Sequence, residues 1–393
     1  MESSAAVPKN RSGRAASIDL LRGVVMVLMA LDHTRDFFGS TAFEPTDLDK
    51  TNAPLFFTRW ITHYCAPVFV FLAGTAAWLS RGKKSDSKLT QFLLTRGVWL
   101  IFLDAFVITF LWSFRALLTF TILQVFWALG TSMLVLAAVV RLRVRVITVL
   151  GLMLVCGHDA LDHFHPYKTG SAHVAWSMFH ESAFDLSIAG HHVGLVYPIV
   201  PWCGVMMLGY AFGSRFNRTV EDRSRETLRL GIAITLFFVV LRASNIYGDP
   251  TPWTMRGGAG TLLSFLNCEK YPPSLCYLAM TLGPALILLA LFDRSRVGES
   301  NAFARAIVIY GRVPLFYYLL HIALIHLTSN AIYWMQTHRW RTGWSGDNRL
   351  NIGLPLTYLS WIAIVLALYL PCRWFANVKA SAWGREQRWL SYL

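Results

Sequence analysis

The chain has 393 residues, of which 55% are hydrophobic and only 15% are charged, and its mean hydropathy is +0.44. A soluble domain of this length does not need so much apolar sequence, so the composition favours a polytopic membrane protein. The formal net charge of +14 does not indicate nucleic-acid binding, because Lys and Arg gather in short segments between apolar runs. We therefore expect a lipid bilayer around the protein and no nucleic acid as a partner.

Apolar runs long enough to cross a membrane recur along the chain and predict an all-α polytopic bundle of about ten transmembrane helices. The ninth run contains Gly311 and Pro314, which predict a break in that helix. The first run has no small-residue cleavage site, so we expect it to remain as an anchor. The ten segments are expected at about 18–38, 54–80, 89–112, 117–140, 144–160, 194–213, 228–245, 273–292, 303–337 and 354–372.

These segments form a single expected domain, 18–372, which follows a polar N-terminus (1–17) and precedes a basic tail (373–393). If both termini are cytoplasmic, the inner segments carry more than twice as many Lys and Arg residues as the outer ones. This bias predicts cytoplasmic termini. We expect a multi-pass protein of a bacterial-type inner or plasma membrane, and a homodimer is compatible with the sequence.

The first apolar run, Ser17 to Phe38, contains ionisable residues, which in a membrane usually face a cavity and usually have a function. Arg22 and His33 are eleven residues apart, close to three helical turns, so both fall on one face of a helix at about 16 Å from each other. This face therefore predicts one wall of a transmembrane site.

His33 is a candidate general base or transient acyl acceptor, with Asp32 as an accompanying carboxylate. Adjacent residues on a helix point about 100° apart, so Asp32 need not orient His33, and it can instead pair with Arg35 one turn later. His63 begins the second segment on the same side and can complete the same site. Each histidine can also be an interfacial residue without a catalytic role.

Three arginines lie near the expected cytoplasmic ends of helices: Arg22, Arg96 and Arg312. Arginine binds phosphate in a bidentate manner, so together they can form a cationic mouth for a phosphate-bearing ligand. The alternative is local pairing, for example of Arg22 with Asp19, or contact with lipid headgroups.

Four further residues are candidates for binding a substrate. Tyr197 and Trp202 can stack on a sugar ring, although an aromatic belt at the membrane interface also explains them. Tyr317 and His321, one turn apart, can close a passage through the bundle, or they can simply pack within a kinked helix. The outer loop at about 161–192 is rich in histidine but matches no specific metal motif, so no metal is expected.

Five stretches occur in an order that resembles the heparan-alpha-glucosaminide N-acetyltransferase-like family of multi-pass membrane acyltransferases. The resemblance covers nearly the whole chain, and its opening S-[IL]-D-x-[LF]-R-G pattern is moderately specific. The stretches are SIDLLRGVVMVLMALDH (17–33), APVFVFLAGTAAWLS (66–80), YPIVPWCGVMMLGY (197–210), PPSLCYLAMTLGPALILL (272–289) and YGRVPLFYYLLHIALIH (310–326).

The resemblance implies transfer of an acetyl group from cytosolic acetyl-CoA, as acyl donor, to an amino sugar or other glycan acceptor on the far side of the membrane. It also implies a histidine near the outer ends of the first two helices. The lysosomal enzyme's key histidine lies in the loop that joins these helices, before a Trp-Asn-Gly stretch. The corresponding loop here, DFFGSTAFEPTDLDKTNAPLFF, has neither feature, and only His33 and His63 lie nearby.

Two functions of different classes fit the sequence. The first is an integral membrane acyltransferase that uses acetyl-CoA. The second is a transporter of a small solute, in which intramembrane Asp, His and Arg residues line a proton or solute path. Transporters often contain repeats in matching halves, and no repeat is visible here, so the sequence favours the enzyme.

Overall fold

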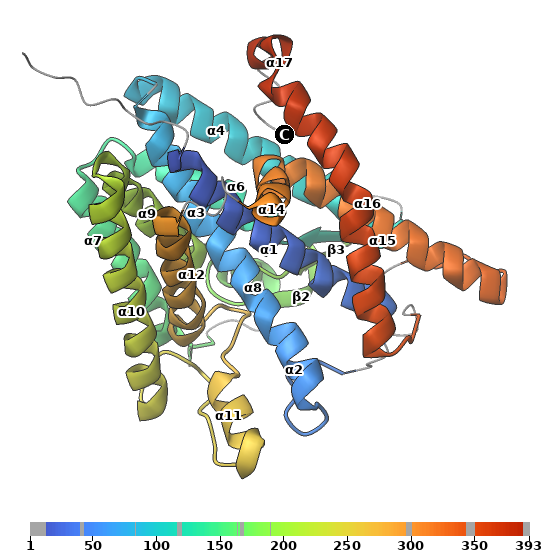
Figure 1. Ribbon diagram of the computed structural model, residues 1–393. Helices are drawn as coiled ribbons and strands as arrows, with labels where there is room; N and C mark the ends of the chain where they lie inside the picture. Colours follow the sequence, from blue (N-terminus) through green and yellow to red (C-terminus); the bar gives the residue numbers. More distant parts are fainter. Residues whose placement is uncertain are drawn as a thin grey trace, which may run out of the picture.

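The computed structural model describes residues 13–39, 43–82, 84–115, 120–162, 164–165, 169–188, 190–295, 301–342 and 350–387. Its described part is mostly helical (Figure 1), and seven helical stretches in it are long and apolar enough to cross a membrane. The prediction of a polytopic helical protein is confirmed at this level. The seven stretches are 53–81, 86–113, 144–161, 220–244, 275–295, 314–337 and 354–380.

Several of these stretches consist of two or three consecutive helical elements. A π-helical turn (Leu103–Ile108), for example, joins α4 to α5. The helices are α1 (Gly13–Phe38), α2 (Ala53–Trp60), α3 (Cys65–Arg81), α4 (Asp86–Phe102), α5 (Thr109–Ser113), α6 (Val125–Val139), α7 (Val144–Gly157), α8 (Gly170–Phe179), α9 (Ile199–Phe212), α10 (Val220–Ser244), α11 (Gly258–Leu266), α12 (Leu275–Ser295), α14 (Ala302–Arg312), α15 (Pro314–Thr337), α16 (Leu354–Ala380) and α17 (Ala382–Glu386).

Helix α1 lies at the centre of the bundle, where it contacts α3, α12, α14, α15 and α16. It contains more charged residues than a simple membrane span, yet it is almost entirely buried by its neighbours. Its first residues and α17 lie at the same end of the bundle (Figure 1). The helix that carries Arg22, Asp32 and His33 is therefore enclosed by protein.

The ninth predicted segment is divided at Val313, as Gly311 and Pro314 predict, into α14 and α15. Helix α14 crosses α1 at two glycines. A Cβ atom on Gly23 would collide with the backbone carbonyl oxygen of Ile307, and one on Gly311 would collide with that of Asp19. The two backbones are in direct contact because neither glycine has a side chain.

A three-stranded sheet was not expected from the sequence. It contains β1 (Phe120–Leu123), β2 (Ala183–Ile188) and β3 (His191–Leu195), in the order β1-β3-β2. Strand β3 is parallel to β1 and antiparallel to β2. Strand β1 occupies the start of the expected segment 117–140, so its helix α6 begins only at Val125. Strand β3 likewise precedes α9, so the helix of the expected segment 194–213 begins only at Ile199.

The N-terminus of α6 lies inside the bundle and is stabilised by a carboxylate. Asp104, in the π-helical turn, accepts hydrogen bonds from the backbone N–H groups of Gln124 (2.6 Å) and Trp127 (2.7 Å) through Oδ2. A negative group at a helix N-terminus satisfies otherwise unpaired donors and interacts favourably with the helix dipole. Helix α6 thus begins at Val125, where Asp104 is available as a partner for its free N–H groups.

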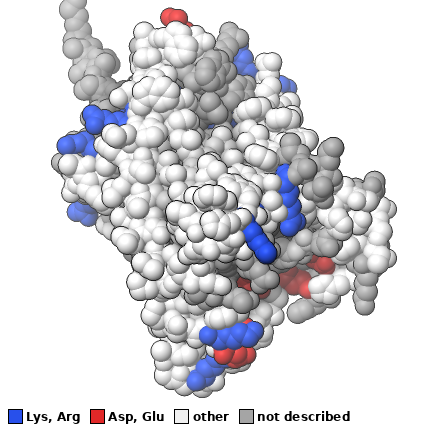
Figure 2. Space-filling model, turned by 90° about the vertical axis from the view of Figure 1, so that its right-hand side faces the viewer, with Lys and Arg blue, Asp and Glu red and all other residues white. Residues whose placement is uncertain are grey.

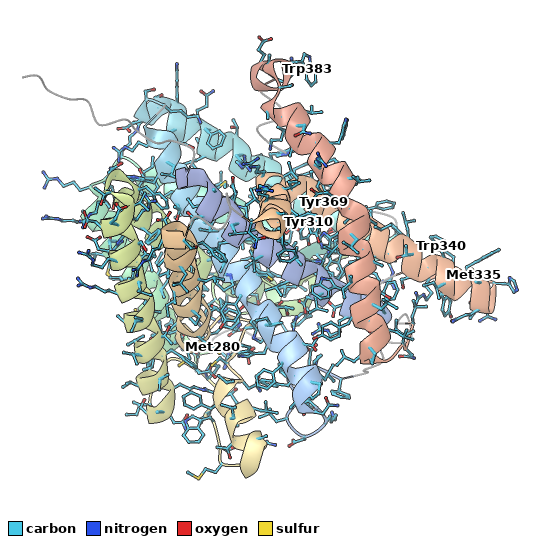
Figure 3. The ribbon with its side chains drawn as sticks, viewed as in Figure 1. Met280, Tyr310, Met335, Trp340, Tyr369 and Trp383 are labelled. Atoms are coloured by element: carbon cyan, nitrogen blue, oxygen red, sulfur yellow. The ribbon has the colours of Figure 1, made fainter. Side chains whose placement is uncertain are left out.

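Uncharged residues predominate on the outer surface. Figure 2 shows a face on which Lys, Arg, Asp and Glu residues gather in a few small patches. Helices α10 and α16 expose many large apolar side chains, as expected of helices that contact lipid. The C-terminal end of α15 extends away from the bundle with Met335 and Trp340, whereas Tyr310 of α14 and Tyr369 of α16 lie together where these helices meet (Figure 3).

Candidate active site

Two cavities adjoin each other within the bundle, and we call the residues that line both of them the constriction. The arginine cavity, defined by Arg22, Arg96 and Arg312, has a volume of about 260 Å³. The histidine cavity, defined by His33 and His63, has a volume of about 620 Å³. The two cavities have four wall residues in common: Met29, Phe69, Val125 and Tyr318. They therefore adjoin each other along α1.

The arginine cavity brings together the three arginines that the sequence singled out. Lys379 is a fourth cation in its wall, and the described residues that line it include no carboxylate. The sequence analysis placed Lys379 in a tail after residue 372, but α16 continues to Ala380 and carries this lysine to the cavity. Four positive groups over otherwise mostly apolar walls form a site that favours an anionic ligand with an apolar portion.

Arg22 is held in place by both of the crossing helices. Its guanidinium donates to Asp19 Oδ1 (3.0 Å) and to the carbonyl oxygen of Gly311 (2.9 Å). Arg312 lies 3.9 Å from the other oxygen of Asp19, and its side chain is 59% exposed. Arg22 therefore pairs with Asp19 and also lines the cavity, so local pairing and a role in binding a ligand do not exclude each other.

His33 lines the histidine cavity and is hydrogen-bonded to a second buried histidine. Its Nδ1 atom lies 2.7 Å from Nε2 of His321, and the two rings are stacked with centroids 4.9 Å apart. Nδ1 of His321 lies 3.0 Å from the backbone carbonyl oxygen of Tyr317. The three groups form a chain that begins at a backbone carbonyl and ends at the cavity.

This chain determines which nitrogen of each neutral ring carries the proton. The carbonyl of Tyr317 can only accept, so the hydrogen of His321 is on Nδ1 and its Nε2 is an acceptor. His33 must then donate from Nδ1, which leaves its Nε2 without a hydrogen. The second nitrogen of His33 is therefore available as a base.

Asp32 belongs to a buried ion-pair cluster on the same cavity. Its two oxygens lie 2.8 and 2.6 Å from Nη1 of Arg59, and Oδ1 lies 3.0 Å from Arg35. Arg35 also contacts Asp36 at 2.7 Å. The expected pair with Arg35 is present, whereas the pair with Arg59 was not predicted from the sequence. In the described structure Asp32 makes no hydrogen bond to His33, so it organises charges in the wall and does not orient the imidazole.

His63 lies in the wall of the same cavity, as predicted, in the 3₁₀ turn (Ile61–Tyr64) between α2 and α3. Its ring contacts that of Tyr277 (5.4 Å between centroids), and its backbone carbonyl accepts a hydrogen bond from the Tyr277 hydroxyl (2.8 Å). Its Nδ1 atom is buried without a partner among the described residues. His63 thus lacks the hydrogen-bonded support that fixes His33.

The other four predicted residues are divided between the cavity wall and the layer behind it. Tyr197 lines the histidine cavity and packs on Trp202, which is fully buried. Tyr317 and His321 are also fully buried, and the described cavity walls include neither of them nor Trp202. Only Tyr197 can contact a ligand in this structure, whereas the other three support residues that can.

The loop between α10 and α12 covers part of the histidine cavity and contributes Glu269 and Lys270 to its wall. Burial raises the pKa of the Glu269 carboxyl above its usual value. The ammonium group of Lys270 lies over the ring of Tyr271, 4.9 Å from its centroid, and makes no ion pair with any described residue. These two side chains add ionisable groups to a wall in which Asp32, Arg35, Asp36 and Arg59 neutralise one another.

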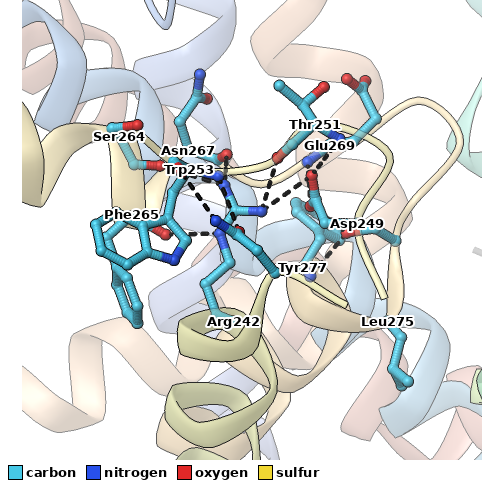
Figure 4. A network of polar contacts seen from close by, with 12 residues as sticks. Arg242, Asp249, Thr251, Trp253, Ser264, Phe265, Asn267, Glu269, Leu275 and Tyr277 are labelled. Atoms are coloured by element: carbon cyan, nitrogen blue, oxygen red, sulfur yellow. Dashed lines mark hydrogen bonds and ion pairs between the residues drawn. The ribbon is translucent and has the colours of Figure 1, made fainter. Parts of the chain in front are cut away.

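Arg242 at the end of α10 holds this loop in place (Figure 4). Its guanidinium donates to four backbone carbonyl groups and lies 3.2 Å from Asp249. Asp249 Oδ2 in turn accepts hydrogen bonds from the N–H of Glu269 (2.9 Å) and the hydroxyl of Ser274 (2.7 Å). The loop backbone is therefore fixed close to the two residues that reach the cavity. The four carbonyl groups belong to Thr251, Ser264, Phe265 and Asn267.

The described residues contain no group of three or more His, Cys, Asp and Glu side chains that could hold a metal ion. The described titratable residues of the two cavities instead form ion pairs, form the hydrogen-bonded pair His33–His321, or line the walls as single groups. The arrangement can bind an anionic ligand on one side, accept a proton on the other and connect the two through a short constriction.

The family model for the catalytic region of heparan-alpha-glucosaminide N-acetyltransferase matches residues 14–247, which is more than half of the chain. The match includes α1 and the loops and helices that form most of both cavities. No curated protein matches the chain. On this match, the chain belongs to the heparan-alpha-glucosaminide N-acetyltransferase family, and it is a multi-pass membrane protein of the acetyltransferase type.

Proposed function

We propose that the protein transfers an acetyl group from cytosolic acetyl-CoA to an amino sugar or other glycan acceptor at the extracytoplasmic face. The observation that carries this proposal is the contact between the two cavities, which have Met29, Phe69, Val125 and Tyr318 in common. A donor that enters from one side and an acceptor that enters from the other can meet only where the cavities adjoin. A cationic cavity and a base on opposite sides of this point suit such a reaction.

The arginine cavity is the proposed donor site. Acetyl-CoA carries several phosphate charges and an apolar thioester end, which match the cations and the apolar wall of this cavity. With both termini in the cytoplasm, Arg22, Arg96, Arg312 and Lys379 lie on the cytoplasmic side. The donor can then bind without crossing the membrane, with its thioester directed toward the constriction.

The histidine cavity is the proposed acceptor site. The acceptor amine attacks the thioester carbonyl carbon, a C–N bond forms and the C–S bond breaks. Nε2 of His33 takes the proton that the attacking nitrogen loses and returns it to the leaving thiolate, so the products are an N-acetylated acceptor and the free thiol. A hydroxyl acceptor would react in the same way to give an O-acetyl product.

The residues behind His33 have a positioning role in this proposal. The hydrogen bond that Nδ1 of His33 donates to Nε2 of His321 keeps Nε2 of His33 free of hydrogen in the resting state. After His33 has taken a proton on Nε2, its Nδ1 still donates to His321, so the imidazolium remains hydrogen-bonded. Trp202 supports Tyr197, whose ring can pack against a sugar ring.

The direct test uses purified protein in detergent with radiolabelled acetyl-CoA and a panel of amino sugars, followed by separation of labelled sugar from donor. We expect label in at least one sugar, and no labelled sugar with heat-denatured protein. A transporter would instead move an intact solute across a vesicle membrane without forming a new bond. Absence of transfer to every acceptor, together with uptake of an unmodified sugar by vesicles, would contradict the proposal.

A further inference from the structure

The constriction between the two cavities contains a single polar side chain. Of the four residues that line both cavities, Met29, Phe69 and Val125 offer only apolar atoms or a thioether, whereas Tyr318 has a hydroxyl group. Tyr318 is 2% exposed and belongs to α15, one turn before His321. The only hydroxyl group among the described residues that line both cavities is therefore that of Tyr318.

The hydroxyl of Tyr318 is arranged as a hydrogen-bond donor without an acceptor. The indole Nε1 of Trp112 donates to its oxygen at 3.3 Å, which occupies one of the oxygen's acceptor positions. Among the described residues the structure shows no acceptor for the phenol's own hydrogen. A buried donor without a partner is unfavourable, so a carbonyl oxygen in the constriction would be bound in preference to an apolar group.

The position of the phenol ring is fixed by three aromatic neighbours. It contacts Phe126 edge to face at 4.6 Å between centroids, and it contacts His33 and His321 in the same manner at 5.7 and 5.1 Å. His33 also contacts the indole of Trp112 at 4.8 Å. The base, the phenol and the indole therefore form one rigid group around the point where the cavities meet.

We propose that Tyr318 is a catalytic residue whose hydroxyl donates a hydrogen bond to the carbonyl oxygen of the acyl thioester. This inference rests on the proposed function. As the acceptor nitrogen attacks the carbonyl carbon, the C=O electron pair moves to the oxygen, and the Tyr318 hydrogen bond stabilises the negative charge. The charge returns as the C–S bond breaks, and the acceptor's proton passes through His33 to the thiolate. Tyr318 keeps its own proton throughout.

The test compares Tyr318→Phe with Tyr333→Phe, which is a matched control. Both tyrosines belong to α15, but Tyr333 lies outside the described walls of both cavities, and a phenylalanine would keep its ring contact with Arg341. Loss of one donor to a developing oxyanion lowers kcat by roughly 10²- to 10³-fold. We expect this loss in Tyr318→Phe with a much smaller change in donor affinity, and wild-type kcat in Tyr333→Phe.

Infrared difference spectroscopy supplies a readout that a merely structural role would not change. With ¹³C-carbonyl acetyl-CoA bound and no acceptor present, the carbonyl stretch should lie at a lower frequency in the wild type than in Tyr318→Phe, because a hydrogen bond weakens the C=O bond. Equal frequencies, or equal kcat values for the two Tyr→Phe variants, would overturn the inference. If the wild type binds donor with the shifted carbonyl but transfers to no acceptor, only the proposed function is contradicted.

Discussion

The two cavities differ in how their charges are arranged. In the histidine cavity, Asp32, Arg35, Asp36 and Arg59 form a closed cluster in which each charge has a partner within the protein. The arginine cavity has four cations in its wall and no carboxylate, with Asp19 behind as a partner of Arg22. The histidine cavity thus contains a group of mutually paired charges beside the single groups Glu269 and Lys270, whereas the wall of the arginine cavity presents cations alone among its described charged residues.

This difference indicates that the two ligands are recognised by different physical means. A ligand of the arginine cavity gains from charge-assisted hydrogen bonds, which are about twice as strong as those between neutral groups. A ligand of the histidine cavity finds charges that are mostly paired already, with Lys270 as the exception, so shape, aromatic contact and single hydrogen bonds contribute more to its binding. The three predictions that follow test this contrast.

The largest effect is expected from His33→Ala. Loss of a general base lowers the rate by about 100-fold or more, and the change lies beyond the constriction from the donor cations, so kcat should fall while donor affinity is retained. Steady-state kinetics and equilibrium binding of acetyl-CoA measure the two quantities separately. If His33→Ala keeps its turnover and His63→Ala loses it, His63 is the base. If both keep it, the histidine mechanism is excluded.

The next effect concerns the cations. Each charge-assisted contact contributes about 1.5–3 kcal/mol, so Arg22→Ala, Arg96→Ala and Arg312→Ala should each weaken donor binding about 10- to 150-fold. Turnover at saturating donor should change much less, in contrast to His33→Ala. Arg229→Ala, an exposed arginine on α10 outside the cavity, is the matched control and should bind normally. Unchanged donor affinity in all three variants would exclude this donor site.

The smallest effect is the response to salt. Mobile ions screen exposed cations such as Arg312 but have little effect on charges paired inside the protein. Raising the salt concentration from about 0.05 to 0.5 M should weaken donor binding by roughly 3- to 10-fold, whereas the acceptor KM should stay nearly constant. Arg312→Ala should show a shallower dependence for the donor. A steeper salt dependence for the acceptor than for the donor would contradict the proposal that charge recognition is stronger in the arginine cavity than in the histidine cavity.

The sequence predicted the parts of the site that interrupt an apolar pattern. Arg22 and His33 stand out within the first apolar run, and the period of an α-helix places them on one face. Gly311 and Pro314 likewise predicted the division into α14 and α15. An ionisable residue or a helix breaker in a membrane segment is rare, so each carries information that does not depend on the rest of the fold.

The residues that the sequence analysis missed depend on tertiary contacts. Tyr318 is one of two adjacent tyrosines, and only the packing of α15 distinguishes the one that faces the cavities. Arg59 becomes important because α2 brings it to Asp32, 27 positions earlier in the chain. Strand β1 and the end of β3 lie within runs that were expected to be membrane helices, whereas β2 lies in the expected outer loop. Nothing in the sequence shows that His33 and His321, 288 positions apart, form a hydrogen bond.

The glycine crossing of α1 and α14 fixes the position of these two helices along each other. Gly23 and Gly311 bring the backbones into contact, and Arg22 donates to the carbonyl of Gly311 at this same point. Neither helix can slide along the other without a backbone collision, so the span from the cations to His33 has a set length. If the arginine cavity holds the acyl donor as proposed, a longer acyl chain would require smaller side chains at the constriction, because the helices cannot move apart along their axes.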